Sequence, residues 1–513
     1  MQSPREALEF LENSLRSLDA DTLASMAESL AQQAHEAAAL HPDRPEFSRL
    51  EERFLDIAVR HAESGREFAR QARLLSEIAA MPGNEPLSPA RHLESARAWV
   101  KAGRIDHARE QLRRAEESAA ALNDTQTRVQ ADVEKAILQL NAEEDVVEGV
   151  SRTKPVGDEA RRLGCNRAYL DLATAECRAL IWAGHLTRAE ARVMDALEHA
   201  PADSEPRRAL LAMRARVWSK QGQPEAALGL AKSAVDDDDP AGEPLEALGQ
   251  VYADYGLHTR ARVEWDRATD VYHRQADRFG KARVSYLQAK LRVLEARWGE
   301  AEGPLSMAES EFRTLGHTTC LTHAKLLRAE MLFGLGEREK ADQQLSQLLN
   351  SRAVQSSLAL SCSAYEIAGD ILRWSRRFEL ALFEYRRSRD AGASAGMPRE
   401  QARGALNCAH MHLALNEPAL SETQAMLALG LVKRSFGEGL IEFVEAKLAL
   451  ARVHLKRGNV ADARKWTVEA LEAGDELDLL EDTHTLRTRT LISDLKAMEA
   501  RVASAEKKHG KDA

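Results

Sequence analysis

Small side chains return along this chain at a step of about 39 residues, and this periodicity constrains the fold more than any other feature. It is clearest around Gly249, Ala261 and Ala268. Small residues at such positions let two helices approach closely, and the large residues near them, Tyr252 and Trp265, fill the space around the contact. The pattern predicts pairs of closely packed amphipathic helices.

A turn is expected between the two halves of each pair, at Gly256 in this example. A residue without a Cβ atom readily adopts the left-handed conformation that ends many helices. The same step places the corresponding turns at Gly103, Glu143, Gly184, Gly222, Gly256, Ala296, Gly336, Arg376, Asn416 and Gly458.

Two columns of small residues keep a fixed distance from these turns. The column before the turn holds Ala96, Ala136, Cys177, Ala215, Gly249, Ala289, Ala329, Gly369, Ala409 and Ala451. The column after it holds Ala108, Glu148, Ala189, Ala227, Ala261, Ala301, Ala341, Ala381, Ser421 and Ala463. Only Glu148 departs from the pattern, and such agreement at a steady step favours a repeat over an irregular bundle.

This spacing resembles the tetratricopeptide repeat. The resemblance implies an all-α, right-handed superhelical solenoid of about 10–12 antiparallel helix pairs. The family's usual step is about 34 residues, so these units are enlarged and are similar to those of bacterial regulatory and signalling proteins of that superfamily. We expect the extra residues to extend the second helix and its following loop, as at 313–316 and 391–396.

Four segments are expected. Residues 1–88 form an N-terminal helical region with pairs over 5–40 and 45–80 that turn near Asp19 and Ser64, and a Pro/Gly-rich break follows at 81–89. Residues 89–482 form the solenoid, residues 483–506 a helix that caps its exposed end, and residues 507–513 a frayed tail.

The unit over 123–163 fits the pattern poorly. Pro155 follows Val150 to Lys154 in the expected second helix, and we expect this stretch to interrupt that helix. Sequence drift explains the departure more simply than a bend or a partner contact. Pro304 predicts a late start or a kink in another second helix.

Composition narrows the class of protein. Aromatic residues make up only 5% of a chain rich in Ala, Leu, Glu and Arg, which favours helices. The net charge of −10 disfavours nucleic-acid binding, and no apolar run is long enough to insert into a membrane. The opening residues lack the pattern of a secretory signal and the five scattered cysteines form no CxxC motif, so we expect a cytoplasmic protein with reduced thiols.

Catalytic and cofactor motifs are missing from the sequence. Gly280-Lys281 lacks the upstream glycine of a phosphate-binding loop, and no GxSxG or HExxH motif occurs. Cys408 and His412 share a helical face and could supply two metal ligands, but a structural zinc site needs about four. We therefore expect these two residues to pack between helices, and we expect no cofactor, no metal and no enzymatic activity.

The resemblance also implies a binding surface, because the first helices of such arrays line a concave groove. Carrying the groove positions onto this chain gives a basic stretch in the middle units followed by acidic residues, with aromatic residues beside it. The candidate partner-binding residues are Arg178, Trp182, Arg216, Lys220, Arg283, Tyr286, Lys290, Phe333, Asp370 and Trp374. Aromatic and arginine side chains often dominate interface energetics, although such groups also commonly pack between repeats or remain solvated.

These observations predict a non-catalytic scaffold or adaptor that binds a partner protein or peptide with an acidic segment. The alternative is a ligand- or peptide-responsive regulator that acts through a separate effector chain, since small rotations of each repeat accumulate along a solenoid. The first helices lack the lysines of the carboxylate clamp found in chaperone-binding members of the family. The oligomeric state stays open.

Overall fold

The computed structural model describes residues 3–81, 86–437, 440–478 and 486–512. Within these residues the chain is all helical and contains no strand. The first helices are α1 (Pro4–Ser17), α2 (Ala20–Leu40), α3 (Pro45–Ser64), α4 (Phe68–Ala79), α5 (Ser88–Lys101), α6 (Ile105–Leu122), α7 (Thr125–Ala142) and α8 (Val146–Arg162). The expected pairs over 5–40 and 45–80 are confirmed, with Asp19 as the N-cap of α2. Part of the expected break, 82–85, lies outside the described residues.

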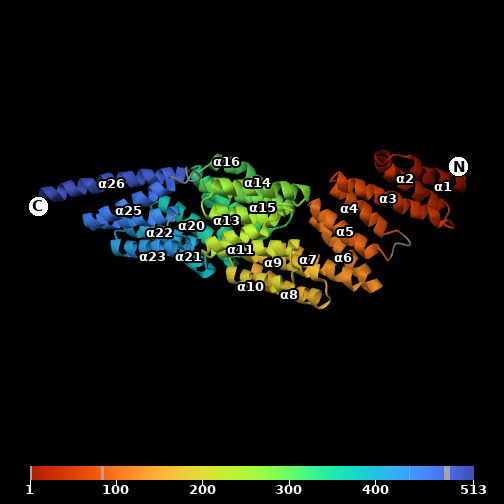
Figure 1. Cartoon of the computed structure of the whole chain (residues 1–513), viewed down its shortest axis with the longest axis horizontal. Helices are drawn as coiled ribbons and strands as arrows, with labels where there is room; N and C mark the ends of the chain where they lie inside the picture. Colours follow the sequence, from red (N-terminus) through yellow and green to blue (C-terminus); the bar gives the residue numbers. More distant parts are fainter. Residues whose placement is uncertain (1–2, 82–85, 438–439, 479–485, 513) are drawn as a thin grey trace. The chain divides into compact units, whose positions relative to one another are not determined.

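The remaining helices continue the succession of antiparallel pairs (Figure 1). They are α9 (Asn166–Ala183), α10 (Leu186–His199), α11 (Glu205–Lys220), α12 (Pro224–Ala234), α13 (Gly242–Asp254), α14 (His258–Arg274), α15 (Arg278–Leu294), α16 (Trp298–Thr314), α17 (Thr318–Gly334), α18 (Arg338–Leu349), α19 (Arg352–Ser356), α20 (Leu358–Trp374), α21 (Phe378–Ala395), α22 (Pro398–Ala414), α23 (Pro418–Phe436), α24 (Ile441–Lys456), α25 (Val460–Asp478) and α26 (Leu486–Asp512). The second helices α16 and α21 extend through the enlarged segments, as predicted.

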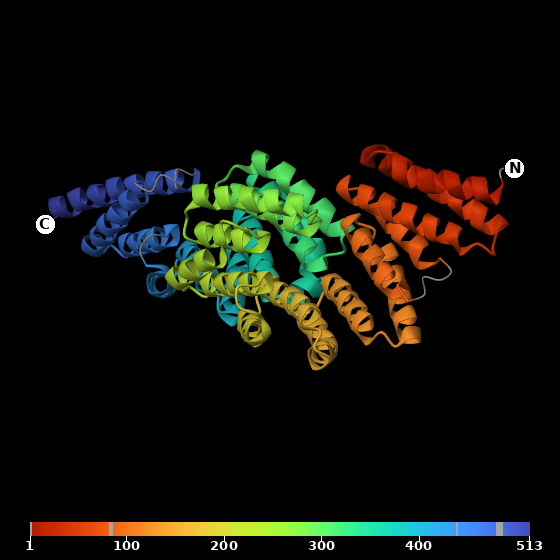
Figure 2. The same ribbon diagram turned by 45° about the vertical axis from the view of Figure 1, so that its right-hand side comes forward.

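The chain divides into two compact units. One comprises residues 1–138 and 155–169, and the other comprises residues 139–154 and 170–513. The division passes through α7, α8 and α9, and the expected boundary at 88–89 lies inside the first unit. In the second unit, Figure 2 shows the helices α13 to α16, drawn in yellow-green and green, as consecutive antiparallel neighbours.

The small residues lie between paired helices and not toward water. Ala96, Ala215 and Ala261 are fully buried. A Cβ atom on Gly249 would lie 2.5 Å from the Trp265 ring, which is much closer than atoms can pack. The close helix–helix contact predicted from the sequence is therefore confirmed, and the large residues fill the space that the small ones leave.

The predicted turns are confirmed at every position except Glu143, because all the others have positive φ. Gly256 shows the arrangement, since its N–H donates to the carbonyl of Ala253 and the N–H of Leu257 donates to that of Tyr252. This is the hydrogen-bond pattern of a left-handed helix end. The hairpins with a positive-φ turn thus share one local hydrogen-bond pattern.

Two expectations about prolines are wrong, the interruption of the helix at Pro155 and the late start of the helix that holds Pro304. Pro155 lies inside a continuous α8, and Pro304 lies inside α16, which begins at Trp298. The alternative of a kink at Pro304 stays a prediction. A proline removes one donor, and the carbonyl that loses it belongs to the residue four positions earlier. Those residues, Ser151 and Glu300, are exposed, so water can take the place of the missing donor.

The last helix, α26, covers the end of the solenoid. Its residues Leu491, Leu495, Met498 and Val502 are buried in one core cluster with α24 and α25, as predicted for a capping helix. The helix runs to Asp512, through the segment for which the sequence predicts a frayed end. None of the described helices is long and apolar enough to cross a membrane.

Candidate functional site

The first helices of the second unit surround a pocket. The centre of a water molecule can reach about 100 Å³ within it. Its walls come from α9, α11, α13, α15, α17, α20 and α22, so the pocket is the inner space of the solenoid. The polar and aromatic groups on these walls are Trp182, Arg216, Lys220, Gln250, Tyr286, Lys290, His323, Glu330 and Glu400.

The pocket is narrow because the solenoid closes on itself. The turn after α9 touches the start of α20, and a Cβ atom on Gly184 would lie 2.8 Å from the backbone nitrogen of Ala359. The turn after α11 is equally crowded, since a Cβ atom on Gly222 would lie 2.4 Å from Cβ of Ser435. Helices that are far apart in sequence thus meet along a line that we call the seam.

Polar side chains bond to carbonyls across the seam, between residues 141 to 212 positions apart. These hydrogen bonds run from Thr318 Oγ1 to Ala142 O (3.0 Å), from His323 Nε2 to Trp182 O (2.7 Å), from His185 Nε2 to Ser356 O (3.1 Å), from Ser357 Oγ to Ala183 O (3.1 Å), from Ser356 Oγ to Glu144 O (3.0 Å) and from Arg399 Nη1 to Asp254 O (3.2 Å). Most of them satisfy carbonyls at helix ends, which have no partner within their own helix.

Two lysines of the pocket, Lys220 and Lys290, have no carboxylate within salt-bridge distance among the residues that the structure describes. Burial lowers the pKa of Lys290, and the nearby charge of Lys220 lowers it further. Like charges at close range disfavour the charged form. The two amines therefore form a local positive region that would be stabilised by an anion.

Two carboxyl groups, Glu330 and Glu400, line the same pocket. In the described part of the chain neither forms an ion pair. Burial raises the pKa of Glu330 to about 7, and the nearby charge of Glu366 contributes in the same direction against Arg403 and Lys290. The pocket thus holds two lysines and two glutamates that form no ion pair with one another in the described residues.

Aromatic rings form one wall. The Trp182 ring lies 5.1 Å from that of Tyr286 and 5.2 Å from that of His323, measured between centroids. Burial lowers the pKa of His323 to about 3, so this imidazole is neutral and donates its Nε2–H across the seam. The Trp182 indole Nε1–H is buried and has no acceptor among the described residues.

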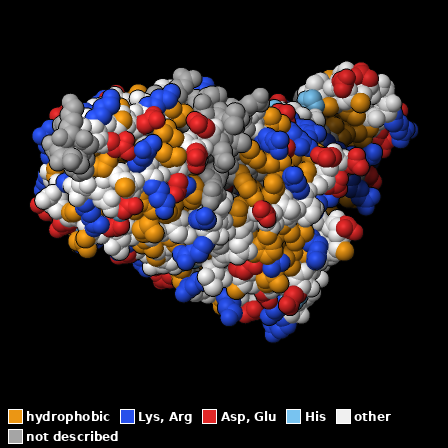
Figure 3. Space-filling view, turned by 60° about the vertical axis from the view of Figure 1, so that its left-hand side comes forward, with side chains coloured by type: hydrophobic (Ala, Val, Ile, Leu, Met, Phe, Trp, Pro, Cys, Tyr) orange, Lys and Arg blue, Asp and Glu red, His pale blue; other side chains and the backbone are white. Residues whose placement is uncertain are grey.

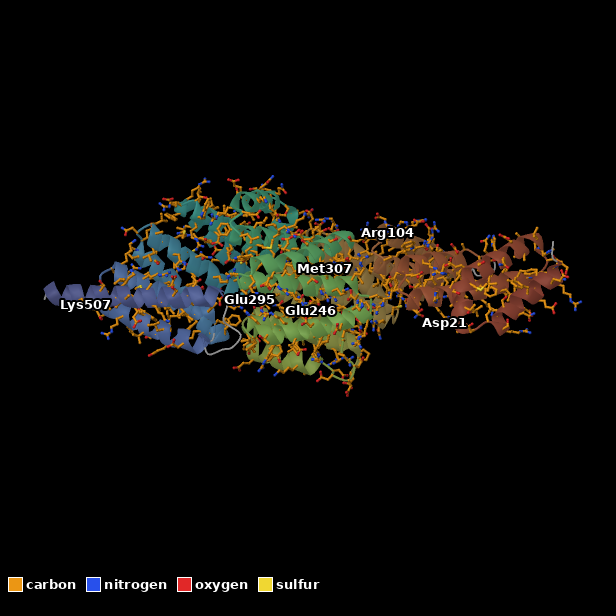
Figure 4. The ribbon with its side chains drawn as sticks, turned by 90° about the horizontal axis from the view of Figure 1, so that it is seen from above. Asp21, Arg104, Glu246, Glu295, Met307 and Lys507 are labelled. Atoms are coloured by element: carbon orange, nitrogen blue, oxygen red, sulfur yellow. The ribbon has the colours of Figure 1, made fainter. Side chains whose placement is uncertain are left out.

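Beside the pocket lies a buried network of ion pairs. Glu246, labelled in Figure 4, lies on α13 and accepts hydrogen bonds from Arg283 and from Tyr272. Glu243 pairs with Arg283 at 2.7 Å and with Arg178 at 3.1 Å. Burial alone would raise the pKa of Glu243, but the surrounding arginines outweigh it and lower the pKa to about 2. Such a network holds three first helices together.

The structure brings half of the predicted partner-binding residues to the pocket. The residues that line it are Trp182, Arg216, Lys220, Tyr286 and Lys290. Arg216 also contacts Glu243 and Glu246 at 3.4 Å.

The other predicted residues lie elsewhere. Arg178 and Arg283 pair with Glu243, and Arg283 is only 1% exposed. The positive charge of these two arginines is therefore balanced by a carboxylate inside the protein. The remaining three are separate from the pocket, because Asp370 accepts from Tyr385 at 2.7 Å, and Phe333 and the exposed Trp374 lie beside Arg338.

Sequence reasoning missed several wall residues, among them His323, Met397 and Glu400. They lie on α17 and α22 or just before α22. Their approach to Trp182 and Lys220 follows from the closure of the solenoid, which nothing in the local sequence predicts. Glu330 lines the same pocket without an ion pair to either lysine in the described chain.

Cys408 and His412 are both buried, as expected for residues packed between helices. His412 Nδ1 lies 2.6 Å from Glu417 Oε2. Across the described residues, no group of three or more His, Cys, Asp and Glu side chains is placed to hold a metal ion. On the face shown in Figure 3, hydrophobic patches alternate with charges of both signs.

The fold is a tetratricopeptide-like solenoid. This follows from the consecutive helix pairs, the buried small columns and the repeated left-handed turns. No protein-family model matches the sequence, and no curated protein sequence matches it.

Solved structures with similar arrangements exist. One is a chain of the APC/C hetero-tetramer Cut9–Hcn1, with 12% identity, a TM-score of 0.45 and 96% coverage of both chains. Another is a Rap protein complexed with the Competence and Sporulation Factor, with 13% identity, a TM-score of 0.43 and coverage of 66% of this chain and 99% of that one. A third is the apo form of RapI, with 11% identity, a TM-score of 0.34 and coverage of 66% and 98%. At these values the likenesses transfer no function to this chain.

Proposed function

We propose that this chain is a non-catalytic adaptor that holds a segment of another protein in the inner pocket of its second unit. An acidic group of that segment lies between Lys220 and Lys290. The observation that supports this proposal is the pair of pocket lysines without a carboxylate partner in the described residues. Buried charges in proteins are normally paired, so an incoming carboxylate would gain more here than at an exposed lysine.

Trp182 and Tyr286 would contact the same segment through their rings. Aromatic side chains in a pocket contribute large contact areas at little cost in conformational entropy. The irregularly spaced cysteines, four of them buried thiols, suit a reducing compartment such as the cytoplasm.

The test is direct binding of labelled peptides to the full chain. Reversing Arg178 or Arg216 would disturb the buried glutamates, so the informative variant is Lys220→Met combined with Lys290→Met. We expect acidic peptides to bind the wild type and to lose at least tenfold in affinity, about 1.4 kcal/mol, on the double variant. Lys325→Met is the matched control, since Lys325 lies on α17 outside the pocket. Equal binding to both variants, with helicity intact by circular dichroism, would reject the proposal.

The second candidate is a regulator whose shape responds to the bound segment. It is favoured by one observation, that the His323 side chain lines the pocket and donates across the seam to the backbone carbonyl of Trp182. A ligand that moves the His323 side chain would strain or tighten the seam. Small-angle scattering with and without peptide separates the two candidates, because an adaptor keeps its radius of gyration and a regulator changes it.

A further inference from the structure

Five charged side chains line the inner pocket, and one of them, Arg216, already contacts Glu243 and Glu246. Of the other four, Lys290 is near enough to Glu330 and to Glu400 for their charges to interact, and Lys220 lies near Lys290. Yet no amine lies within 4.0 Å of a carboxyl in this set, as far as the described residues go. The positive and negative groups face a common space and do not bridge it.

An anion alone would not suit that space. It would stabilise the lysines but would repel Glu330 and Glu400 once these are ionised. A ligand with a carboxylate and an ammonium satisfies both sides, and each charge-assisted hydrogen bond is stronger in a partly buried site than in water.

The wall of the pocket also offers a hydrogen-bond donor for the ligand's carboxylate and aromatic ring faces for its ammonium group. The buried Nε1–H of Trp182, which has no acceptor in the described chain, is a third donor for a carboxylate. The faces of Trp182 and Tyr286 attract an ammonium ion through their ring quadrupoles. Gln250 donates to Asp254 at 2.9 Å, which leaves its side-chain oxygen available as an acceptor.

The size of the pocket limits the ligand. Space of about 100 Å³ for water centres equals the liquid volume of roughly three water molecules, at about 30 Å³ each. This space matches a ligand of a few non-hydrogen atoms, such as a small amino-acid residue. A helix or a folded loop does not fit, and a single residue does.

We propose that the inner pocket is a dipolar site for a zwitterion that carries one carboxylate and one ammonium within a single residue. Free α-amino acids have this chemistry, and so does an acidic residue at the free amino terminus of a peptide. The inference rests on the proposed function only in using the same pocket, and it replaces a purely acidic ligand by one that carries both charges.

The test uses the full chain and two sets of probes at about pH 8, where Glu330 is mostly ionised. The first set is the free protein amino acids, followed by N-acetyl and amide derivatives of those that bind. The second set is short peptides with an amino-terminal Asp or Glu, with the amino group free or acetylated. Binding is measured by calorimetry up to about 10 mM, so that a dissociation constant of about 1 mM is still detected.

We expect at least one free amino acid or free-amino peptide to bind. Removing either charge from the ligand should weaken binding at least tenfold, and so should Lys290→Met or Glu330→Gln in the protein. Lys325→Met and Glu339→Gln, which lie outside the pocket, should leave binding unchanged. Binding by free amino acids identifies a small-molecule site, and binding by peptides alone identifies a protein terminus.

Two results would overturn the inference. One is equal binding of N-acetylated and free probes with no effect of Glu330→Gln, which would mean a simple anion site and would leave the adaptor proposal standing. The other is no binding of any zwitterion while internal acidic peptides still bind through the lysines. If zwitterions bind and no internal acidic peptide does, the adaptor proposal fails and this inference stands. The comparisons between probes need no protein variant, so misfolding affects only the Glu330→Gln arm, whose folding is checked by circular dichroism.

Discussion

Glycine occupies two of the small positions, Gly249 and Gly369, because an aromatic side chain of the paired helix fills the space that a Cβ atom would need. The Trp265 ring lies against Gly249, and the Tyr385 ring lies against Gly369. A ring on one helix and a missing side chain on the other thus form one complementary contact, and both are readable in the sequence.

Gly249→Ala should destabilise the second unit by about 1–3 kcal/mol, because the new methyl group would overlap the indole of Trp265. Gly229→Ala is the control, since Gly229 lies inside α12 with open space around it. Alanine is the better helix former, so this control should gain roughly 0.5–1 kcal/mol. Urea denaturation followed by circular dichroism measures both, and equal effects of the two substitutions would contradict the packing argument.

Glu330→Gln tests the electrostatics of the pocket. The pKa of this carboxyl is about 7 in the folded chain against 4.5 for an ordinary glutamate, so ionisation is harder in the folded state. Stability attributable to Glu330 is therefore full below about pH 4.5 and declines as the pH rises to about 7. We expect Gln to stabilise the protein by an amount on the order of 2 kcal/mol at about pH 8 and to make no difference at about pH 4. Thermal unfolding at both pH values checks this, and a pH-independent difference would count against it.

Helices and their ends could largely be predicted from the sequence, because both depend on local information. Gly256 ends α13 through hydrogen bonds to residues within one turn, and Ala261 faces the adjacent helix. The helix ends expected from the prolines were wrong, since Pro155 and Pro304 lie inside helices where an exposed carbonyl can bind water. A helix tolerates such a proline in its interior, and only the exposure of the preceding turn reveals this.

The element with the strongest consequence for truncation is α4. Its Ala72 belongs to the same core cluster as Leu93, Ala96 and Trp99 of α5, and Ser95 Oγ donates to the carbonyl of Ala72 at 2.7 Å. The expected boundary at 88–89 would cut this packed interface. Helices α4 and α5, on the two sides of that expected boundary, belong to the same compact unit.

A chain that begins at residue 89 should therefore lose the order of α5 and α6. Removing α4 exposes the apolar face of α5, and each large buried side chain that is exposed costs about 1.5–3 kcal/mol. We expect a lower thermal midpoint, greater binding of a hydrophobic dye and rapid amide exchange confined to residues 89–122. Unchanged exchange protection in that range would show that α4 contributes nothing to the packing.

At the scale of the second unit, the seam decides where the site lies. Sequence reasoning placed Trp182, Lys220 and Lys290 on the inner surface, and the structure agrees. It could not place His323 or Glu400 beside them, because the pairing of helices that are four repeats apart depends on the sum of many small rotations. The charges of Arg178 and Arg283 were misjudged because their glutamate partners lie 37 to 65 residues away, on other helices.

Gly184→Ala and Gly256→Ala test the seam as a matched pair. Both glycines have φ near +80°, so both substitutions cost about 1–2 kcal/mol of backbone strain. Only the new Cβ at position 184 meets another segment, the backbone of Ala359. We expect this variant to lose a further amount on the order of 1–3 kcal/mol and to show a larger radius of gyration by small-angle scattering. Equal radii and equal stabilities would mean that the seam contributes little.

The seam also restricts how this protein can change over evolutionary time. Open solenoids tolerate the gain or loss of a repeat, because each unit touches only its neighbours. Here the hydrogen bonds from His185 to Ser356 and from Thr318 to Ala142 connect distant parts of the chain. They form only if the number of hairpins between the two bonded residues stays the same. Duplication or deletion of a single hairpin inside this interval would shift every contact out of register. Changes of length should therefore accumulate outside the closed turn, toward the two ends of the chain.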